Sequence, residues 1–272
     1  MFDDVRPLHG LCNVNVELTS RCNKNCWMCG RRERERLHGP QEEGDMTQET
    51  VYKIANELPP GLLVQLHNNG EPLVYPHFGH AAACFNVRHF TNIVTNGKLL
   101  FRKHDEIIGK LDTLSVSVFE NDPEADAQYA ILEGFLDKKG DQRPFVTARL
   151  IGNIPPEQEK WYTDLGLEIV RRTLHDPRGS VNYRKEPTKP EAGFCWDMFT
   201  RLAINYKGDV SCCVRYDPEG DLVLGNINET SLYDMWYGEK RQYMLAKHIQ
   251  GRRCDLDYCG KKCHYWGVPT GV

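Results

Sequence analysis

NVNVELTSRCNKNCWMC, residues 13–29, opens with a short apolar run and ends with three clustered cysteines. The run Val14–Leu18 is typical of a buried parallel strand. Cys22, Cys26 and Cys29 follow it directly, where a loop at the carboxyl end of that strand would lie. A strand followed at once by clustered thiols indicates a sheet whose loops carry the chemistry.

Short apolar runs alternate with longer amphipathic stretches from residue 13 to about residue 172, which is typical of repeated βα units. Right-handed crossovers of this kind close a sheet on itself, with functional loops at the carboxyl ends of the strands. The sequence therefore predicts an α/β fold with a partial (β/α)6 TIM barrel. The predicted strands are Val14–Leu18, Leu62–Leu66, Thr91–Val94, Thr113–Val118, Phe145–Ile151 and Leu167–Val170, and helices are predicted to begin near Thr47, Phe78, Leu99, Asp122 and Pro155.

The spacing of the first three cysteines indicates which kind of metal centre they would bind. Three thiolates within eight residues can hold three irons of a 4Fe-4S cubane and leave the fourth iron without a protein ligand. A bidentate amino-acid ligand can bind that iron, and the methionine part of S-adenosylmethionine (SAM) is such a ligand. A structural zinc site is the alternative. Zinc would need a fourth Cys or His close by, for which His38 is a candidate on distance alone.

The three-then-two spacing of Cys22, Cys26 and Cys29 resembles the CxxxCxxC signature of the radical SAM superfamily. This resemblance implies a 4Fe-4S cluster that, once reduced, cleaves SAM to a 5′-deoxyadenosyl radical, which abstracts a hydrogen atom from an unactivated C–H bond. The family usually has an aromatic residue just before the last cysteine, packing near adenine. Here Met28 holds that position and Trp27 precedes it.

Further marks of the family follow the next predicted strands. Gly70-Glu71-Pro72 resembles the GEP motif, whose backbone and side chain receive the SAM amino group, and Thr95-Asn96-Gly97 resembles the family's TNG. The fourth strand offers hydroxyls that often approach the SAM ribose or carboxylate, and the fifth resembles the segment that supplies a basic residue and adenine contacts. Ser115 can equally be an ordinary strand hydroxyl, and Arg149 a solvated strand end. The resemblance thus implies SAM contacts by Met28, Gly70, Glu71, Pro72, Thr95, Asn96, Ser115, Ser117, Arg149 and Ile151.

The last third of the chain has a different pattern. Residues 174–193 contain prolines and many charged residues without periodicity, which predicts a linker or a crossing between domains. Lys207-Gly208-Asp209 lies between two apolar runs and predicts a hairpin, and Ser231–Gln250 is predicted to form one amphipathic helix. The sequence therefore predicts a barrel over residues 8–180 and a small α+β iron-sulfur domain over residues 181–272.

This last third resembles the SPASM and Twitch extensions that follow many radical SAM barrels. Cys195 is followed after twelve residues by Gly208, and Gly208 after four residues by Cys213. The GNI and SLxxxW stretches of the family are matched by residues 225–227 and 231–236. The resemblance implies a second, auxiliary 4Fe-4S cluster. Because a full SPASM domain needs seven or more cysteines for two clusters, the shorter Twitch form with one cluster is favoured.

The ligands of the auxiliary cluster follow from the same resemblance. Cys212 is the adjacent alternative to Cys213, and only one of the two should face the cluster, because consecutive residues on a strand point to opposite faces. Cys254 can replace either member of the final pair, whose spacing is one residue longer than usual. Zinc is the alternative metal, since four thiolates suit both. The implied ligands are Cys195, Cys213, Cys259 and Cys263.

The amino-acid composition limits the cellular compartments and the partners that we expect for the protein. Eleven cysteines in a chain without an export signal more often bind metal or do chemistry than form disulfides. Cys12 and Cys84 stand apart and are interpreted as small buried thiols. A formal charge of −4 gives no reason to expect nucleic acid as a partner, and no run approaches the 18 apolar residues of a transmembrane helix. We therefore expect a cytoplasmic protein without a membrane partner.

Together these features predict an oxidoreductase-type enzyme, for which no catalytic acid or base can be named. The auxiliary cluster would either take an electron from the substrate radical or help to hold the substrate. A small-molecule substrate is favoured, because the chain starts close to its first strand and leaves no room for a separate peptide-recognition domain. The alternatives are modification of a peptide presented by a partner protein, and a non-enzymatic iron-sulfur or zinc binding module. A flavodoxin- or ferredoxin-type protein is the expected reductant.

Overall fold

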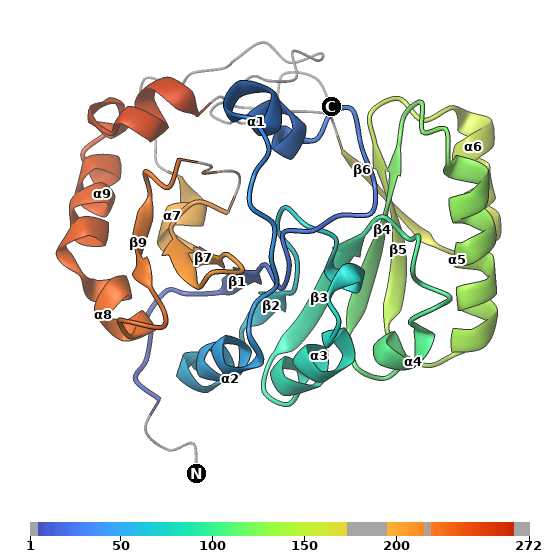
Figure 1. The fold of residues 1–272 in the computed structure, drawn as a ribbon, viewed down its shortest axis with the longest axis horizontal. Coiled ribbons are helices and arrows are strands. Elements are labelled where there is room, and N and C mark those ends of the chain that lie inside the picture. Colours follow the sequence, from blue (N-terminus) through green and yellow to red (C-terminus); the bar gives the residue numbers. More distant parts are fainter. Residues whose placement is uncertain (1–4, 173–194, 215–216, 218, 264–272) are drawn as a thin grey trace.

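Nine strands form one continuous sheet in the order β6-β5-β4-β3-β2-β1-β7-β8-β9 (Figure 1). The computed structural model describes residues 5–172, 195–214, 217 and 219–263. The bounds of the strands are β1 Asn13–Val16, β2 Leu63–Gln65, β3 Phe90–Thr95, β4 Thr113–Phe119, β5 Phe145–Ile151, β6 Glu168–Arg172, β7 Arg201–Ile204, β8 Asp209–Ser211 and β9 Val223–Asn226.

Strands β1 to β6 are parallel neighbours, and helices connect them in βα units. The predicted partial barrel is confirmed, and each predicted strand overlaps an observed one with ends at most two residues apart. The helix expected near Leu99 begins only at His104, after a stretch of turns. The helical elements of this part are α1 Gly30–His38, α2 Gln48–Glu57, η1 Pro72–Val74, α3 Phe78–Asn86, α4 His104–Ile107, α5 Ala125–Lys139 and α6 Pro156–Asp164.

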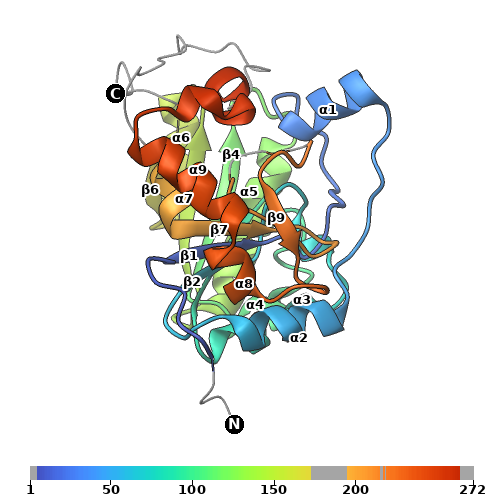
Figure 2. The ribbon, with the colours of Figure 1, turned by 90° about the vertical axis from the view of Figure 1, so that its left-hand side faces the viewer.

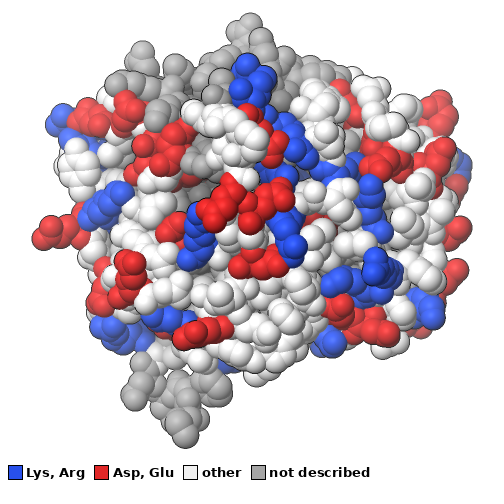
Figure 3. Space-filling model, viewed as in Figure 1, with Lys and Arg blue, Asp and Glu red and all other residues white. Residues whose placement is uncertain are grey.

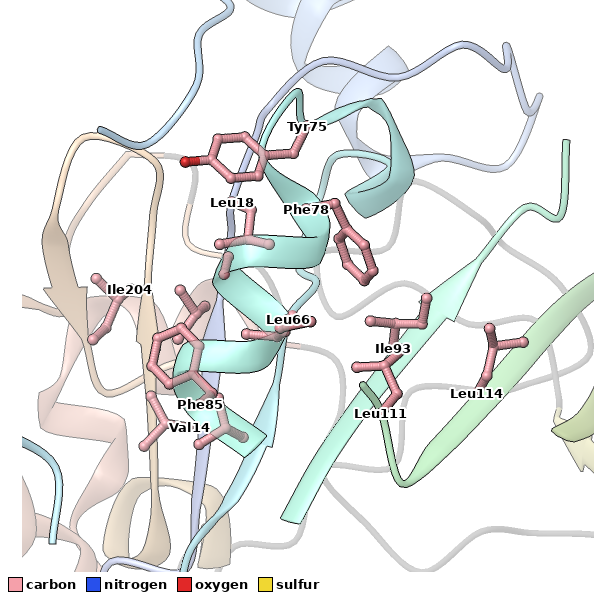
Figure 4. Close-up of a cluster of buried hydrophobic side chains, with 14 of the residues drawn as sticks. Val14, Leu18, Leu66, Tyr75, Phe78, Phe85, Ile93, Leu111, Leu114 and Ile204 are labelled. Atoms are coloured by element: carbon pink, nitrogen blue, oxygen red, sulfur yellow. The ribbon is translucent and has the colours of Figure 1, made fainter. Parts of the chain in front are cut away.

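The two faces of the barrel strands differ in polarity. Val14 and Val16 of β1 are fully buried in the main core, where α3 packs against the strands (Figure 4). Asn13 and Asn15 lie on the other face of β1, because successive strand residues point to opposite faces. On that face, Asn13 Nδ2 donates to Gln65 Oε1 of β2 at 3.0 Å. The outer face of the barrel sheet is therefore apolar, while its inner face offers hydrogen-bonding groups.

The C-terminal third continues the same sheet. Strand β7 pairs in parallel with β1, and β7 and β8 form an antiparallel pair around Gly208, whose φ of +93° favours glycine. The predicted hairpin is thereby confirmed. Leu202 and Trp236 from this third are buried in the main core beside barrel residues. Both ribbon views place helices α8 (Leu232–Tyr237) and α9 (Glu239–Ile249) beside β7 to β9 (Figure 2).

The prediction of one helix over Ser231–Gln250 is wrong, because α8 and α9 are separated at Gly238. Gly238 has extended backbone with ψ of 155°, and an added Cβ would lie 2.7 Å from the carbonyl oxygen of Asp234. The glycine therefore permits a tight turn that the amphipathic pattern conceals. Ser231 does cap α8, since its hydroxyl accepts from Asp234 N at 3.1 Å.

The described residues of the C-terminal third include three further short helical elements: α7 Trp196–Thr200, η2 Arg253–Asp255 and η3 Tyr258–Lys262. The predicted linker over residues 174–193 and the predicted domain boundary at residue 180 lie outside the described residues. In the part of the chain that the structure describes, no helix is both long enough and apolar enough to cross a membrane.

Candidate active site

The loop after β1 carries the first group of cysteines. Cys22, Cys26 and Cys29 are partly buried, and they lie close enough for their charges to act on one another. Asn96, just after β3, places its Nδ2 3.9 Å from the Cys22 sulfur and donates to Asn23 Oδ1 at 2.8 Å. Residues at the carboxyl ends of two strands thus fix the cysteine loop.

The donor set of this loop fits a cubane with one open iron. Burial raises the pKa of Cys22, and it raises the pKa of Cys26 to about 12, so the thiols must lose protons when they bind iron. Among the described residues, no three Cys, His, Asp or Glu side chains form a ready site for a single metal ion. His38, the candidate fourth zinc ligand, instead has its Nε2 3.9 Å from Glu219. Three thiols on one short loop therefore suit an iron-sulfur cluster better than zinc.

A buried ion pair that the sequence reasoning missed holds the same loop from the other side. Lys24, between the first two cysteines, places its Nζ 2.6 Å from Asp122 Oδ2 and 3.2 Å from Glu124 Oε2. The side chains of Lys24 and Asp122 are only 5% and 3% exposed. Burial opposes the charge of Lys24, but these two carboxylates raise its pKa. The loop before α5 thus anchors the cysteine loop; a lysine between two cysteines is the only signal that the sequence offered.

The predicted GEP motif packs directly against the chain that leads into the cysteine loop. Glu71 N donates to Arg21 O at 2.9 Å. A Cβ added to Gly70 would lie 1.9 Å from the carbonyl oxygen of Thr19. Because only glycine permits so close an approach of two backbones, Gly70 is required whatever its contact with SAM.

The carboxylate of Glu71 joins the loops after β2 and β3. It is 3% exposed and accepts from Thr95 Oγ1 at 2.7 Å, Asn96 N at 2.8 Å and Leu73 N at 3.1 Å. Burial raises the pKa of Glu71, and these donors act against that rise. Pro72 follows as the first residue of η1, where its missing N–H costs nothing. Glu71 therefore organises the predicted SAM-binding edge, while its contact with the SAM amino group stays a prediction.

Replacing Glu71 by Ala should weaken SAM binding at least tenfold, or about 1.4 kcal/mol. The Thr95 hydroxyl and the Asn96 amide would lose a buried acceptor, so the edge that receives SAM would relax. Calorimetric titration of the reconstituted variant with SAM measures this loss. Glu49→Ala, which removes an exposed carboxylate from α2, is the control and should bind SAM normally. Unchanged affinity in the Glu71 variant would remove this residue from the site.

The other predicted SAM contacts lie farther along the same edge. Ser117 is 6% exposed and lies opposite Arg149 in the register of β4 and β5. Ile151 lies opposite Phe119, two residues closer to the carboxyl ends of these strands. Ser115 Oγ lies 2.8 Å from Thr147 Oγ1, so this hydroxyl has a partner within the sheet. Of the two serines, Ser117 is therefore the better candidate for a ligand contact.

The inner face holds two further polar groups that the sequence reasoning missed. His67 Nδ1 accepts from Val94 N at 3.1 Å, and burial and the nearby charge of Arg149 lower the pKa of His67 to about 3. The ring is thus neutral at physiological pH. Asn15 is 7% exposed; its Nδ2 donates to His67 O at 3.2 Å, and its Oδ1 is buried without a hydrogen-bond partner. Polar residues inside an apolar strand pattern were the available signal.

Two cavities adjoin the cysteine loop. The first, of about 630 Å³, is lined by Cys26, Trp27 and Met28 of the loop and by Phe119 through Glu124 on the other side. The second, of about 460 Å³, lies between the barrel and the C-terminal hairpin, and its lining includes Glu17 of the barrel and Cys213. Both volumes are of the size that holds small ligands.

The second group of cysteines converges in a small core of its own. Cys195, Cys213, Cys259 and Cys263 belong to one cluster of packed side chains. Burial is the largest cause of the raised pKa of Cys259, and the charges of the other three thiols raise this pKa further. The Cys213 thiol donates to the hydroxyl of Tyr258 at 3.8 Å. Thiols from three separate segments are therefore packed into one cluster, which also contains Cys212, and four of them would fit one 4Fe-4S cluster.

The unusual spacing of the final pair has a structural reason. Residues Tyr258–Lys262 form a π-helical turn, in which Cys263 N donates to Tyr258 O at 2.9 Å. A π-turn contains one more residue than an α-turn. Cys259 and Cys263 can therefore face the same site despite the additional residue between them.

The two alternative ligands have different surroundings, although Cys212 belongs to the same packed cluster. Cys212 is 1% exposed, and the charges that act on it, beside that of Cys213, are those of Arg241 and Lys240. Cys254 is exposed, with its sulfur 3.8 Å from Asp255 Oδ1. Cys212 thus differs from the predicted ligands in its neighbours and Cys254 in its exposure, and the ligand set stays a prediction.

Comparison with known proteins agrees with this geometry. Residues 195–264 match SPASM, an iron-sulfur cluster-binding domain. The chain is 34% identical over 164 residues to the tungsten-containing aldehyde ferredoxin oxidoreductase cofactor-modifying protein of Pyrococcus furiosus, a match that spans 57% of this chain but only 42% of that protein. It is 23% identical over 264 residues to the S-adenosyl-L-methionine-dependent 2-deoxy-scyllo-inosamine dehydrogenase of Niallia circulans, covering 94% of each chain.

Solved structures share the fold at low sequence identity. BtrN in complex with AdoMet and 2-DOIA superimposes with a TM-score of 0.62 at 18% identity, over 96% of this chain and 95% of that one. Streptococcus suis SuiB bound to the precursor peptide SuiA gives a TM-score of 0.64 at 14% identity, over 94% of this chain and 71% of that one.

The chain thus shares its fold with BtrN, a protein whose structure was solved with AdoMet bound. Its C-terminal part matches an iron-sulfur cluster-binding domain.

Proposed function

We propose that this chain is a radical SAM enzyme, which reductively cleaves SAM at a cluster held by Cys22, Cys26 and Cys29 and oxidises a polar small molecule. The observation that carries the proposal is the 460 Å³ cavity, whose lining includes both Ser20, next to the cysteine loop, and Cys213 of the C-terminal site. A substrate in this cavity would lie between the two cysteine sites. Sequence identity of 23% to an S-adenosyl-L-methionine-dependent dehydrogenase, over 94% of this chain, supports the same assignment.

When bound, the first cluster supplies SAM cleavage and a hydrogen-abstracting radical, and the second supplies an acceptor for the remaining electron of the substrate. The chain's own residues hold and orient these groups. Gly70 and Glu71 shape the edge that would receive the SAM amino group, and the Met28 side chain lines the cavity at the predicted adenine position. Asn96 and Lys24 hold the cysteine loop in place.

The walls of the 460 Å³ cavity favour a polar substrate. On the face drawn in Figure 3, acidic and basic side chains are interspersed, and acidic ones gather near its centre. In the cavity itself, carboxylates outnumber cations, and several can accept hydrogen bonds from hydroxyl or amino groups. The acidic lining residues are Glu17, Glu35, Glu42, Glu43, Asp209, Asp217 and Glu219, whereas Arg31 and Lys207 are the basic ones. An amino- or hydroxyl-bearing small molecule, such as an aminocyclitol, fits this lining.

Anaerobic protein given a flavodoxin- or ferredoxin-type reductant and SAM should release 5′-deoxyadenosine. With an aminocyclitol deuterated at its carbinol carbon, deuterium should appear in that 5′-deoxyadenosine, and mass spectrometry of both products measures the transfer. We expect one carbonyl product per SAM consumed, because the oxidation needs no second SAM. Cleavage of SAM without deuterium transfer from any aminocyclitol or polyol would reject this substrate class.

Modification of a peptide is the second candidate, favoured by the fold that the chain shares with peptide-bound SuiB. Deuterium transfer from a labelled peptide, and not from a polyol, would select it. A non-enzymatic binding module would instead hold its clusters without cleaving SAM at all. The reducing cytoplasm is the proposed setting, since none of the eleven cysteines forms a disulfide.

A further inference from the structure

A buried arginine lies among the C-terminal cysteines. Arg253, in η2, is 6% exposed, and its Nη1 donates to Cys259 O at 2.7 Å. Burial lowers the pKa of its guanidinium, and nearby thiols act in the opposite direction. A guanidinium stays protonated even when buried, so a positive charge lies beside these thiols at every physiological pH. The thiols that act on it are those of Cys263, Cys259, Cys254 and Cys195.

The packing of η2 against η3 keeps this charge in place. A Cβ added to Gly260 would lie 2.7 Å from both the Cα and the carbonyl oxygen of Cys254, so the two helical turns touch through their backbones. This contact brings the segment that carries Arg253 against the π-turn that carries Cys259 and leads to Cys263. The position of the guanidinium is therefore set by backbone contact as well as by its own hydrogen bond.

A neighbouring histidine helps to fix the position of Cys195 and carries no charge at pH 7. His248 is 1% exposed, and its Nδ1 accepts from Cys195 N at 3.2 Å. Burial and the charge of Arg253 lower the pKa of His248 to about 4, so it is neutral at pH 7. Asp197, the carboxylate that acts on Cys195, is paired with Arg201 at 3.1 Å. Arg253 is thus the cation whose charge bears directly on three of the four predicted ligands.

We propose that Arg253 is a positioning residue that raises the reduction potential of the auxiliary cluster and so makes this cluster the electron acceptor. The reduced cluster carries one more negative charge than the oxidised cluster, so a buried cation beside it favours reduction. The inference rests on the proposed auxiliary cluster. It also assigns that cluster a redox role, in preference to a role in holding the substrate.

The charges around the first cysteine loop are of both signs. Lys24 acts on Cys26 together with Asp122, and Arg31 acts on Cys22 together with Glu71. Cations and carboxylates there oppose one another.

The test uses the full-length chain with Cys22, Cys26 and Cys29 replaced by Ala, so that the C-terminal cluster is observed by itself. In this background, Arg253→Gln should shift the ratio of oxidised to reduced cluster at least tenfold toward the oxidised form at a fixed potential. For a one-electron couple, this tenfold change lowers the midpoint potential by about 59 mV. A redox titration monitored by EPR measures that midpoint potential. Arg253→Lys should recover most of the shift. Arg252→Gln is the matched control, because it removes the same charge from an exposed neighbour paired with Asp255, and it should leave the midpoint unchanged.

The proposal is overturned if Arg253→Gln keeps its full iron content and its cluster has the same midpoint potential as that of the parent protein. If that variant loses its iron, Arg253→His answers the question within one protein, since its midpoint should rise as the pH falls and the imidazole becomes charged. Loss of iron from both variants would assign Arg253 to cluster assembly and reject the redox role. A parent protein without any iron-sulfur cluster would instead refute the proposed function itself, so the two failures are distinguishable.

Discussion

Replacing Cys22, Cys26 and Cys29 together by Ala should abolish reductive SAM cleavage, because no thiolate of the loop would remain to hold the SAM-binding cluster. The rate of 5′-deoxyadenosine formation under dithionite measures the effect, and it should fall to that of the reaction without enzyme. The C-terminal cluster should survive, since its four cysteines belong to a separate packed core.

Cys84→Ala provides the control for this triple variant. Cys84 is a half-buried thiol on α3, in a helix that packs on the outer face of the sheet. Its loss should leave 5′-deoxyadenosine formation intact. Undiminished formation by the triple variant would show that the SAM-cleaving centre lies elsewhere, and it would refute the first cluster assignment.

Anaerobic reconstitution should load about eight irons and eight sulfides per chain, four of each at either cysteine site. The triple variant should therefore retain half of the iron and sulfide. Metal and acid-labile sulfide analyses measure both contents. One zinc and no sulfide in the triple variant would make the C-terminal site a structural zinc site. Nearly eight irons in that variant would show a second auxiliary cluster.

Single substitutions should then divide the C-terminal cysteines into two groups. Cys212→Ala and Cys254→Ala should keep the full iron content, because the first thiol lies beside Arg241 and the second is exposed. Ala at any of the four converging positions should cost most of the auxiliary iron, and those positions are Cys195, Cys213, Cys259 and Cys263. A ligand set that includes Cys254 would contradict this division.

The barrel was predictable because its signals are local. Apolar runs such as Phe145–Ile151 mark buried strands, and glycine at position 70 marks a close backbone approach. The convergence of the four C-terminal cysteines also followed from spacing, through a resemblance that covers that whole segment. Periodicity and spacing are properties of short stretches, so they can be recognised without knowledge of the tertiary contacts.

The features that the sequence did not disclose depend on distant partners. Lys24 is an ordinary loop residue until Asp122, 98 residues away, pairs with it. His67 becomes neutral only because the sheet encloses it beside Arg149. The break at Gly238 was concealed because the flanking segments share one apolar face, and the steric need for glycine arises only in the folded turn.

Because β7 pairs in parallel with β1, one hydrogen-bonded sheet carries both proposed metal sites. The strand that leads into the first cysteine loop is hydrogen-bonded to β7, and β8, which leads to Cys213, is the next strand across. Adjacent strands are about 4.8 Å apart, so the pairing of β1 with β7 sets the spacing between these parts of the two sites. A chain ended before Cys195 would expose β1 as an unpaired edge, prone to pair with other chains. Exchange of C-terminal halves between related enzymes would therefore have to include β7, since that strand completes the barrel sheet.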